Sequence, residues 1–255
     1  MIDVLSPAHR GILEQFAWSN VLLAFDFDGT LSPIVRDRDA ASMRQATRRL
    51  LTDLCRLYPC AVVSGRSRSD VAARLLGLPI RYLVGNHGLE PNGGTPRFAR
   101  AAAKLHSEIV GNLGDVQGVE IEDKRYSLAV HYRKSRAKRE AKQAILDALQ
   151  RSTVPHRVVT GKLVLNLLPA GAPHKGIALR ELRRKANVDT AIYVGDDVTD
   201  EDVFQLGDAG VLGIRVGADA RSAAGYCVRD QRSVDRLLSR LVTLRAETGS
   251  RSAGI

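Results

Sequence analysis

The 255-residue chain is poor in aromatic residues, in cysteines and in long apolar runs. Aromatic residues make up 5% of the sequence, too few for a stacking platform of the kind that binds single-stranded nucleic acid. The three cysteines, Cys55, Cys60 and Cys227, show no metal-binding spacing, and such sparse thiols predict a reduced, cytoplasmic protein. Apolar runs fall short of the roughly 20 residues of a membrane-spanning helix, and the N-terminus lacks a signal-peptide pattern, so we expect no membrane association.

Acidic residues are also fewer than basic ones. The sequence has 28 Asp and Glu against 38 Lys and Arg, which gives a formal net charge of +10. A basic surface suits an anionic small molecule, but it also suits nucleic acid or a general bias toward solubility. The arginines are scattered along the chain and no lysine-rich tail is visible, so we expect no nucleic-acid partner.

The stretch around which the chain is organised is residues 21–35, VLLAFDFDGTLSPIV. Its five apolar residues predict a buried strand of a parallel sheet, which ends at Asp26 and Asp28. Open α/β sheets bind ligands at this carboxyl end. Two carboxylates there repel each other unless a cation or a shared proton lies between them, and Mg²⁺ prefers oxygen ligands completed by a substrate phosphate. The alternative is a turn whose acids are solvated or bind calcium.

Three later strands also end in polar residues. These are Ser64, Gly65 and Arg66 after residues 60–63, Asn86 and His87 after residues 82–84, and Asp196, Asp197 and Asp200 after residues 191–194. A hydroxyl and a guanidinium at a strand end suit phosphoryl oxygens, although the same string can be a turn that opens a helix. His87 can likewise be a structural hydrogen-bonding residue. The acids repeat the chemistry of Asp26 and Asp28 at another strand end, which predicts a hard-metal site.

Residues 91–173 break this alternation of strands and helices. Their pattern predicts the order αββαββ, with a first strand at residues 116–122, and an antiparallel sheet with two helices on one face is a stable α+β unit. An insertion of this kind makes a cap that closes over a site and excludes water. The predicted domains are a core of residues 1–90 and 174–246, a cap of residues 91–173 and a flexible tail of residues 247–255 after a helix at 233–244.

Several strings resemble known motifs. DFDGTL at residues 26–31, SGR at 64–66, KGIAL at 175–179 and GDDVTDEDVF at 195–204 resemble, in order, the four motifs of the haloacid dehalogenase superfamily. Most members are phosphatases with an aspartate nucleophile, and the resemblance implies a Rossmann-like parallel-sheet core with an inserted cap. GNHGLE at residues 85–90, the KxxxxxxHYR-like string from Lys124 to Arg133 and GKLVLNLLP at 161–169 resemble a narrower family, the trehalose-6-phosphate phosphatases.

The resemblance implies a role for each matching residue. Asp26 would attack phosphorus to form an aspartyl-phosphate, Asp28 would transfer the proton, and Ser64 and Lys175 would hold the phosphoryl oxygens. Mg²⁺ would be bound by Asp26, the Asp28 backbone carbonyl and Asp196, with Asp197 or Asp200 around them. The expected substrate contacts are Gly65, Arg66, Asn86, His87, Lys124, His131, Arg133 and Asn166. We expect a monomer that acts on a small sugar phosphate.

One position departs from the narrower family. Where that family usually has Glu and Arg in an ELRP-like string, this chain has Asn166 and Leu168. Asn both donates and accepts hydrogen bonds, but it lacks the charge-assisted strength of a carboxylate. The expected substrate is trehalose 6-phosphate. A related glycosyl phosphate, such as glucosyl- or mannosyl-glycerate phosphate, and a non-catalytic sugar-phosphate-binding module remain as alternatives.

Overall fold

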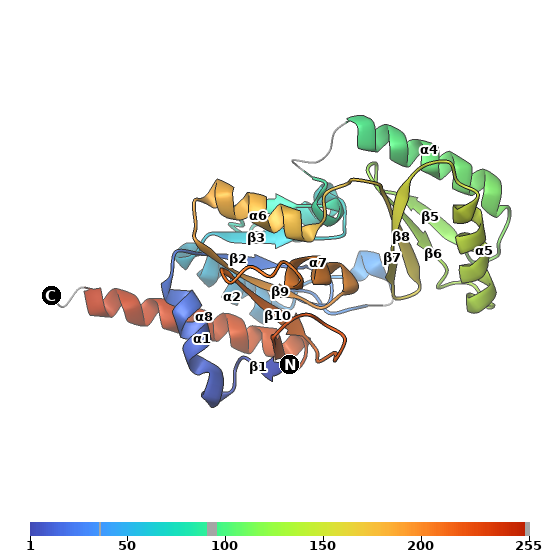
Figure 1. Cartoon of the computed structure of the whole chain (residues 1–255). Helices are drawn as coiled ribbons and strands as arrows, with labels where there is room; N and C mark the ends of the chain where they lie inside the picture. The colour runs from blue at the N-terminus through green and yellow to red at the C-terminus, as the bar shows by residue number, and fades with distance from the viewer. Residues whose placement is uncertain (36, 91–95, 253–255) are drawn as a thin grey trace. The chain divides into compact units, whose positions relative to one another are not determined.

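The computed structural model describes residues 1–35, 37–90 and 96–252. The chain divides into two compact units (Figure 1). We call Met1–His87 with His174–Ile255 the core unit, and Gly88–Pro173 the insert unit. Each unit has its own sheet and its own hydrophobic core, so each is described separately.

The core unit is built on a parallel sheet of seven described strands in the order β1-β11-β10-β9-β2-β3-β4. The strands are β1 (Ile2–Asp3), β2 (Val21–Phe25), β3 (Cys60–Val63), β4 (Tyr82–Val84), β9 (Thr190–Gly195), β10 (Val211–Val216) and β11 (Tyr226–Val228). Every neighbouring pair is parallel. The carboxyl ends of β9, β2, β3 and β4 therefore follow one another along one edge of the sheet, where ligands bind in open α/β folds.

Helices cover both faces of this sheet (Figure 1). They are α1 (Arg10–Trp18), α2 (Gln45–Leu57), α3 (Arg68–Arg74), α6 (Lys175–Ala186), α7 (Glu201–Phe204) and α8 (Gln231–Ser252), with short 3₁₀ turns at Pro7–His9, Arg38–Ala40, Asn86–Gly88 and Val198–Asp200. Alternate residues of β2 point to opposite faces, so Leu23 and Phe25 join the core under α1, α2 and α8, whereas Leu22 and Ala24 join the core under α6. All five residues of β2 are buried, as its continuous apolar run predicts.

The insert unit has the order α4 (Pro96–Leu113), β5 (Glu120–Asp123), β6 (Leu128–His131), α5 (Lys138–Gln150), β7 (His156–Gly161) and β8 (Val164–Pro169). The strands form an antiparallel sheet in the order β5-β6-β8-β7. Leu128 and Leu167 belong to the core that α4 and α5 share, so both helices lie on one face. The predicted fold class, a parallel α/β core with an inserted αββαββ unit, is confirmed.

Two predicted elements have different bounds. The strand expected at residues 116–122 begins at Glu120, because Gly118 turns the chain with a φ of +79° and a Cβ there would lie 2.4 Å from the Ser135 nitrogen. The last helix does not end at Leu244 but continues to Ser252, through most of the predicted tail. Residues 245–252 include no proline, which would end the helix, and the first two of them, Arg245 and Ala246, favour helix. The predicted cap starts with residues 91–95, which lie outside the described residues.

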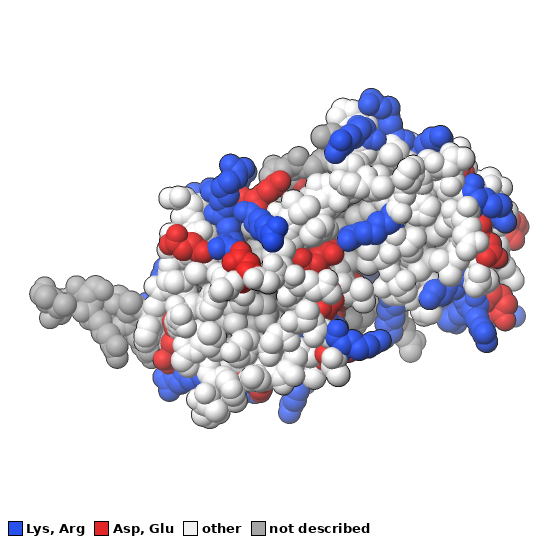
Figure 2. Space-filling model, in the orientation of Figure 1, with Lys and Arg blue, Asp and Glu red and all other residues white. Residues whose placement is uncertain are grey.

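The surface carries charges of both signs. On the face shown in Figure 2, Lys and Arg side chains are spread widely and are interspersed with Asp and Glu. Among the described helices, we find none that combines the length and the apolar character needed to cross a bilayer.

Candidate active site

The candidate site begins where β2 and its neighbour β9 end. Asp26 follows β2 directly, and its backbone N–H donates to the Val194 carbonyl at 2.9 Å, which continues the β2–β9 pairing by one residue. Asp196 follows the end of β9. The parallel register thus brings together two carboxylates that are 170 positions apart in the sequence. Asp26 is only 5% exposed, so its charge must be balanced by protein groups or a bound ion.

A buried lysine lies among these carboxylates. Lys175 is the first residue of α6, and its side chain is 1% exposed. Its Nζ lies 3.1 Å from Asp26 Oδ1 and 2.8 Å from Asp200 Oδ1. Burial alone would lower the pKa of Lys175, but the carboxylates of Asp200 and Asp26 raise it above its ordinary value. Lys175 is therefore a fixed cation within the site.

One lysine does not balance the acids. Asp26, Asp196 and Asp200 each offer a carboxylate oxygen, and these oxygens lie within 4.8 Å of one another. Burial raises the pKa of Asp26 despite the opposing effect of Lys175, and the carboxylates of Asp200 and Asp196 raise it further. Burial, together with Asp200 and Asp197, raises the pKa of Asp196 to about 8. The site therefore lacks positive charge, and its all-oxygen donor set fits a hard divalent cation.

The backbone around the acids leaves space for this cluster. Gly29 has a φ of +81°, and a Cβ at this position would lie 2.0 Å from Asp196 Oδ2. Only glycine permits both this conformation and this close approach. Thr30 Oγ1 donates to Asp196 Oδ1 at 3.3 Å and so helps to orient the same carboxylate. The turn after β2 is thus shaped around Asp196 as well as around its own two acids.

Asp200 is engaged on both of its oxygens. Oδ1 accepts from Lys175 and from the Tyr193 hydroxyl at 2.6 Å, while Oδ2 accepts from the Asp197 backbone N–H at 2.8 Å. Asp200 therefore orients the lysine, and the half-buried Asp197 shapes the turn. The sequence reasoning missed Tyr193, which is fully buried in β9. Its signal was a tyrosine within the apolar run of residues 191–194, because a buried tyrosine hydroxyl needs a partner.

Backbone hydrogen bonds join the loops that follow β3 and β4. The backbone N–H of His87 donates to the Ser64 carbonyl at 3.0 Å, and that of Asn86 donates to the Arg66 carbonyl at 2.7 Å. Asn86 and His87 both have positive φ, at 50° and 58°. A Cβ on Gly65 would lie 2.4 Å from His87 Cε1, so glycine lets the buried imidazole pack against this loop. The buried Ser64, Asn86 and His87 thus form one cluster in the core unit with the half-buried Gly65.

Asp28 is paired with Arg66. The guanidinium donates from Nε to Asp28 Oδ2 at 2.6 Å and from Nη2 to Asp28 Oδ1 at 2.8 Å. Its Nη1 donates to Asp70 Oδ2 at 2.7 Å. The structure therefore places Arg66 on two carboxylates of the core unit. Asp70 is a second residue that the sequence reasoning missed, and its position one helical turn after Arg66 was the available signal.

The four remaining predicted residues belong to the insert unit. Asn166 is 8% exposed and lies on β8 between Leu165 and Leu167, which face the helices, so it points to the opposite face of the sheet. His131 Nε2 lies 3.1 Å from Glu122 Oε2. Lys124 is half-buried beyond the end of β5, and Arg133 Nη2 donates to the Lys162 carbonyl at 3.4 Å.

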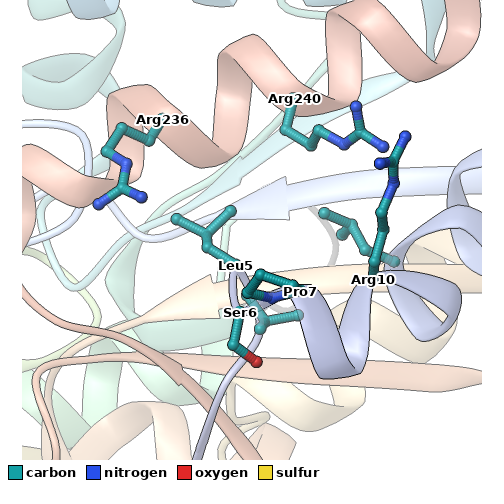
Figure 3. A pocket seen from close by; sticks show the side chains of 8 residues that line it. Leu5, Ser6, Pro7, Arg10, Arg236 and Arg240 are labelled. Carbon is teal, nitrogen blue, oxygen red and sulfur yellow. The ribbon is translucent and has the colours of Figure 1, made fainter.

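A separate hollow lies elsewhere in the core unit, between the chain start and α8 (Figure 3). Its volume is about 320 Å³, and its lining includes Arg10, Arg236 and Arg240 around Leu5 and Pro7. Glu14 Oε1 lies 2.6 Å from Arg10 Nε and 3.0 Å from Arg240 Nη2. This hollow shares no residue with the carboxylate cluster, and we assign it no part in the candidate site.

Comparison with known proteins yields a matching family and several curated relatives. A family described as trehalose-phosphatase matches residues 24–224. The curated trehalose-phosphate phosphatase of Mycobacterium avium (strain 104) is 38% identical over 219 residues, which cover 78% of this chain and 54% of the relative. That of Mycobacterium ulcerans (strain Agy99) is 35% identical over 242 residues, which cover 86% and 62%. The chain thus spans between 54% and 62% of the length of these two relatives.

Solved structures show the same fold. The C-terminal domain of C. albicans trehalose-6-phosphate phosphatase superposes with a TM-score of 0.77 at 22% identity, covering 92% of this chain and 96% of that one. A trehalose-6-phosphate phosphatase related protein gives a TM-score of 0.71 at 25% identity, covering 89% and 99%. At 22% identity, the similarity to the C. albicans domain bears on the fold alone.

Proposed function

Because the chain belongs to the trehalose-phosphatase family, we propose that it hydrolyses trehalose 6-phosphate to trehalose and phosphate. The observation that carries this proposal is the buried Lys175 between Asp26 and Asp200, next to Asp196 at the end of the neighbouring strand β9. A fixed cation beside a buried carboxylate suits the attack of that carboxylate on an anionic phosphoryl group.

In the first step, an Asp26 carboxylate oxygen forms a bond to phosphorus while the bond from phosphorus to the sugar oxygen breaks. The Asp28 carboxyl group gives its proton to the departing sugar oxygen, which leaves as a hydroxyl. Lys175 and the Ser64 hydroxyl hold the phosphoryl oxygens. The product of this step is an aspartyl-phosphate on Asp26.

In the second step, a water molecule attacks the phosphorus of the aspartyl-phosphate. Asp28, now deprotonated, takes the proton from this water, and the bond between phosphorus and the Asp26 oxygen breaks. Phosphate leaves, and both aspartates return to their starting protonation states. One residue therefore acts as the acid and then as the base, which requires its carboxylate to stay within reach of both oxygens.

The family implies a divalent cation, and we propose Mg²⁺. Asp26, the Asp28 backbone carbonyl and Asp196 would hold it, and Asp197 and Asp200 would support them. The cation would offset the charge of the phosphoryl group during transfer. Burial, together with the neighbouring carboxylates, raises the pKa of both Asp26 and Asp196, and a cation between these acids would offset this effect, which supports the assignment.

The prediction that Lys124, His131, Arg133 and Asn166 contact the sugar stays a prediction. Asn166 stands where the family usually has a glutamate, so related glycosyl phosphates must be tested beside trehalose 6-phosphate. An Asn166→Glu variant probes this position directly. If the order of preference among the sugar phosphates is unchanged, residue 166 does not determine which sugar is bound.

The proposal is tested by phosphate release from trehalose 6-phosphate, glucosylglycerate phosphate and mannosylglycerate phosphate, each with Mg²⁺ and with EDTA. We expect release from trehalose 6-phosphate that requires Mg²⁺ and disappears in Asp26→Asn, which replaces the nucleophile with an amide of the same shape. Circular dichroism should show that this variant folds. Substantial turnover by Asp26→Asn would exclude Asp26 as the nucleophile, and release from a glycerate conjugate alone would reassign the substrate.

A further inference from the structure

Arg66 and Asp28 form a two-point ion pair inside the core unit. The Arg66 side chain is 6% exposed, whereas the Asp28 side chain is 40% exposed. The guanidinium lies with its Cζ 5.7 Å from the centre of the Phe27 ring and donates to both oxygens of Asp28. A fork of this kind sets the plane of the carboxylate as well as its distance.

Most donors of Arg66 are already in use. Besides its two bonds to Asp28, the guanidinium donates from Nη1 to Asp70 and from Nη2 to the Arg38 carbonyl at 2.8 Å. Four hydrogen bonds therefore occupy a group that has five N–H donors. A two-point contact to a phosphoryl group, which the SGR string suggested, would require Arg66 to release Asp28 or Asp70.

Asp70 is itself held in place. Arg74 Nε donates to Asp70 Oδ1 at 2.9 Å. Burial opposes ionisation of Asp70, but its hydrogen bonds and charge interactions with Arg66 and Arg74 lower its pKa overall. Arg74 Nη1 also donates to the carbonyls of Asp39, at 3.1 Å, and Ala41, at 2.6 Å. Helix α3 thereby anchors the Arg66 guanidinium to the segment that leads from β2 to α2.

Asp28 needs such an anchor. Its half-exposed side chain follows the β2 strand in a turn whose next residue, Gly29, has a φ of +81°. Both proposed steps require this carboxyl group to lie within hydrogen-bond reach of a reacting oxygen, and small misplacements of a catalytic group cost large factors in rate.

We propose that Arg66 is the positioning residue of Asp28, held in turn by Asp70, and does not bind the substrate phosphoryl group. This inference rests on the proposed function, because it assigns a task to the proposed acid and base. Arg66 acts through Asp28 alone, so the contribution of Arg66 to kcat disappears when Asp28 can no longer transfer a proton.

The test is a double-mutant cycle with Arg66→Lys and Asp28→Asn. Lysine keeps the charge but offers no planar fork, so we expect kcat on trehalose 6-phosphate to fall by about 10- to 100-fold, with KM changed less than about threefold. In the Asp28→Asn background, the same substitution should change kcat by less than about threefold. Arg56→Lys is the matched control, because Arg56 is exposed on α2 and pairs only with Asp53 among the contacts described. It should leave both constants unchanged.

Two outcomes would overturn the inference. An equal loss of kcat in both backgrounds would mean that Arg66 acts independently of Asp28. A KM raised tenfold or more with kcat retained would mean that Arg66 binds the substrate. If Arg66→Lys does not fold, Asp70→Asn replaces it, and its smaller loss of kcat, about three- to tenfold, must also vanish beside Asp28→Asn.

A crystal structure of Arg66→Lys separates this inference from the proposed function. We expect the Asp28 carboxylate to occupy more than one rotamer, whereas a single unchanged rotamer would refute the positioning role whatever the substrate. If the wild-type protein releases phosphate from none of the sugar phosphates, the proposed function fails, and the crystallographic result still decides how Asp28 is held.

Discussion

The carboxylate cluster predicts that the metal-free protein loses stability as the pH rises. Asp196 has a pKa of about 8 in the folded chain against an ordinary value of 3.8, and the pKa of Asp26 is raised as well. Between pH 3.8 and about pH 8, the folded protein therefore holds a proton on Asp196 that the unfolded chain does not bind. The contribution of Asp196 to the free energy of unfolding is therefore fully present below its pKa in the unfolded chain, and it is lost as the pH rises through its pKa in the folded protein.

The magnitude follows from proton linkage. One additional bound proton makes the free energy of unfolding fall by about 1.4 kcal/mol per pH unit, or about 4 kcal/mol between pH 5 and pH 8. We expect about 2–4 kcal/mol, because Asp26 and Asp196 share the same charge environment and titrate together. Bound Mg²⁺ replaces the proton as the neutralising charge, so a saturating concentration should remove most of this loss at pH 8.

The assay is urea unfolding followed by circular dichroism, with EDTA-treated protein and with added Mg²⁺, at both pH values. Asp196→Asn is the control, since its amide cannot titrate and the difference between the two proteins removes the contribution of the six histidines. Equal pH dependence in the wild type and in Asp196→Asn would refute the reasoning, because burial and the neighbouring carboxylates would then not raise the pKa of Asp196.

Three further predictions concern single residues. Gly29→Ala introduces a Cβ 2.0 Å from Asp196 Oδ2, so Mg²⁺ affinity measured by calorimetry should fall at least about tenfold. Gly77→Ala, with the same φ of +81° but nothing within 4 Å of its Cβ, should lose stability without losing affinity. Tyr193→Phe removes a hydrogen bond to Asp200 and should cost about 1.5–3 kcal/mol in urea unfolding together with a measurable fall in kcat. Its control, Tyr58→Phe, removes the bond to the Leu241 carbonyl, so it should cost about 1 kcal/mol and leave kcat unchanged. Gly65→Ala pushes against His87 Cε1 and should raise KM more than it lowers kcat, and an unchanged KM would separate His87 from substrate binding.

Local sequence patterns predicted the fold class and the strand ends at which Asp26 and Asp196 lie. The apolar run of residues 21–25 predicts a strand buried on both faces, and all five residues are buried. Asp26, Ser64, Asn86 and Asp196 follow four strands that are neighbours in the sheet, and carboxyl ends of neighbouring parallel strands must meet. Periodicity and order along the chain carry this information, so no tertiary contact was needed to extract it.

The partners of each side chain were not predictable in the same way. Arg66 reaches Asp28 across 38 positions, and Lys175 reaches Asp200 across 25. Which oxygen accepts from which donor depends on strand register and on the packing of α3 and α6. Neither leaves a periodic signal in the sequence. The sequence alone therefore suggested that Arg66 binds a phosphoryl group, whereas the fold pairs it with Asp28 and Asp70, because burial of a guanidinium requires carboxylates that long-range packing brings within reach.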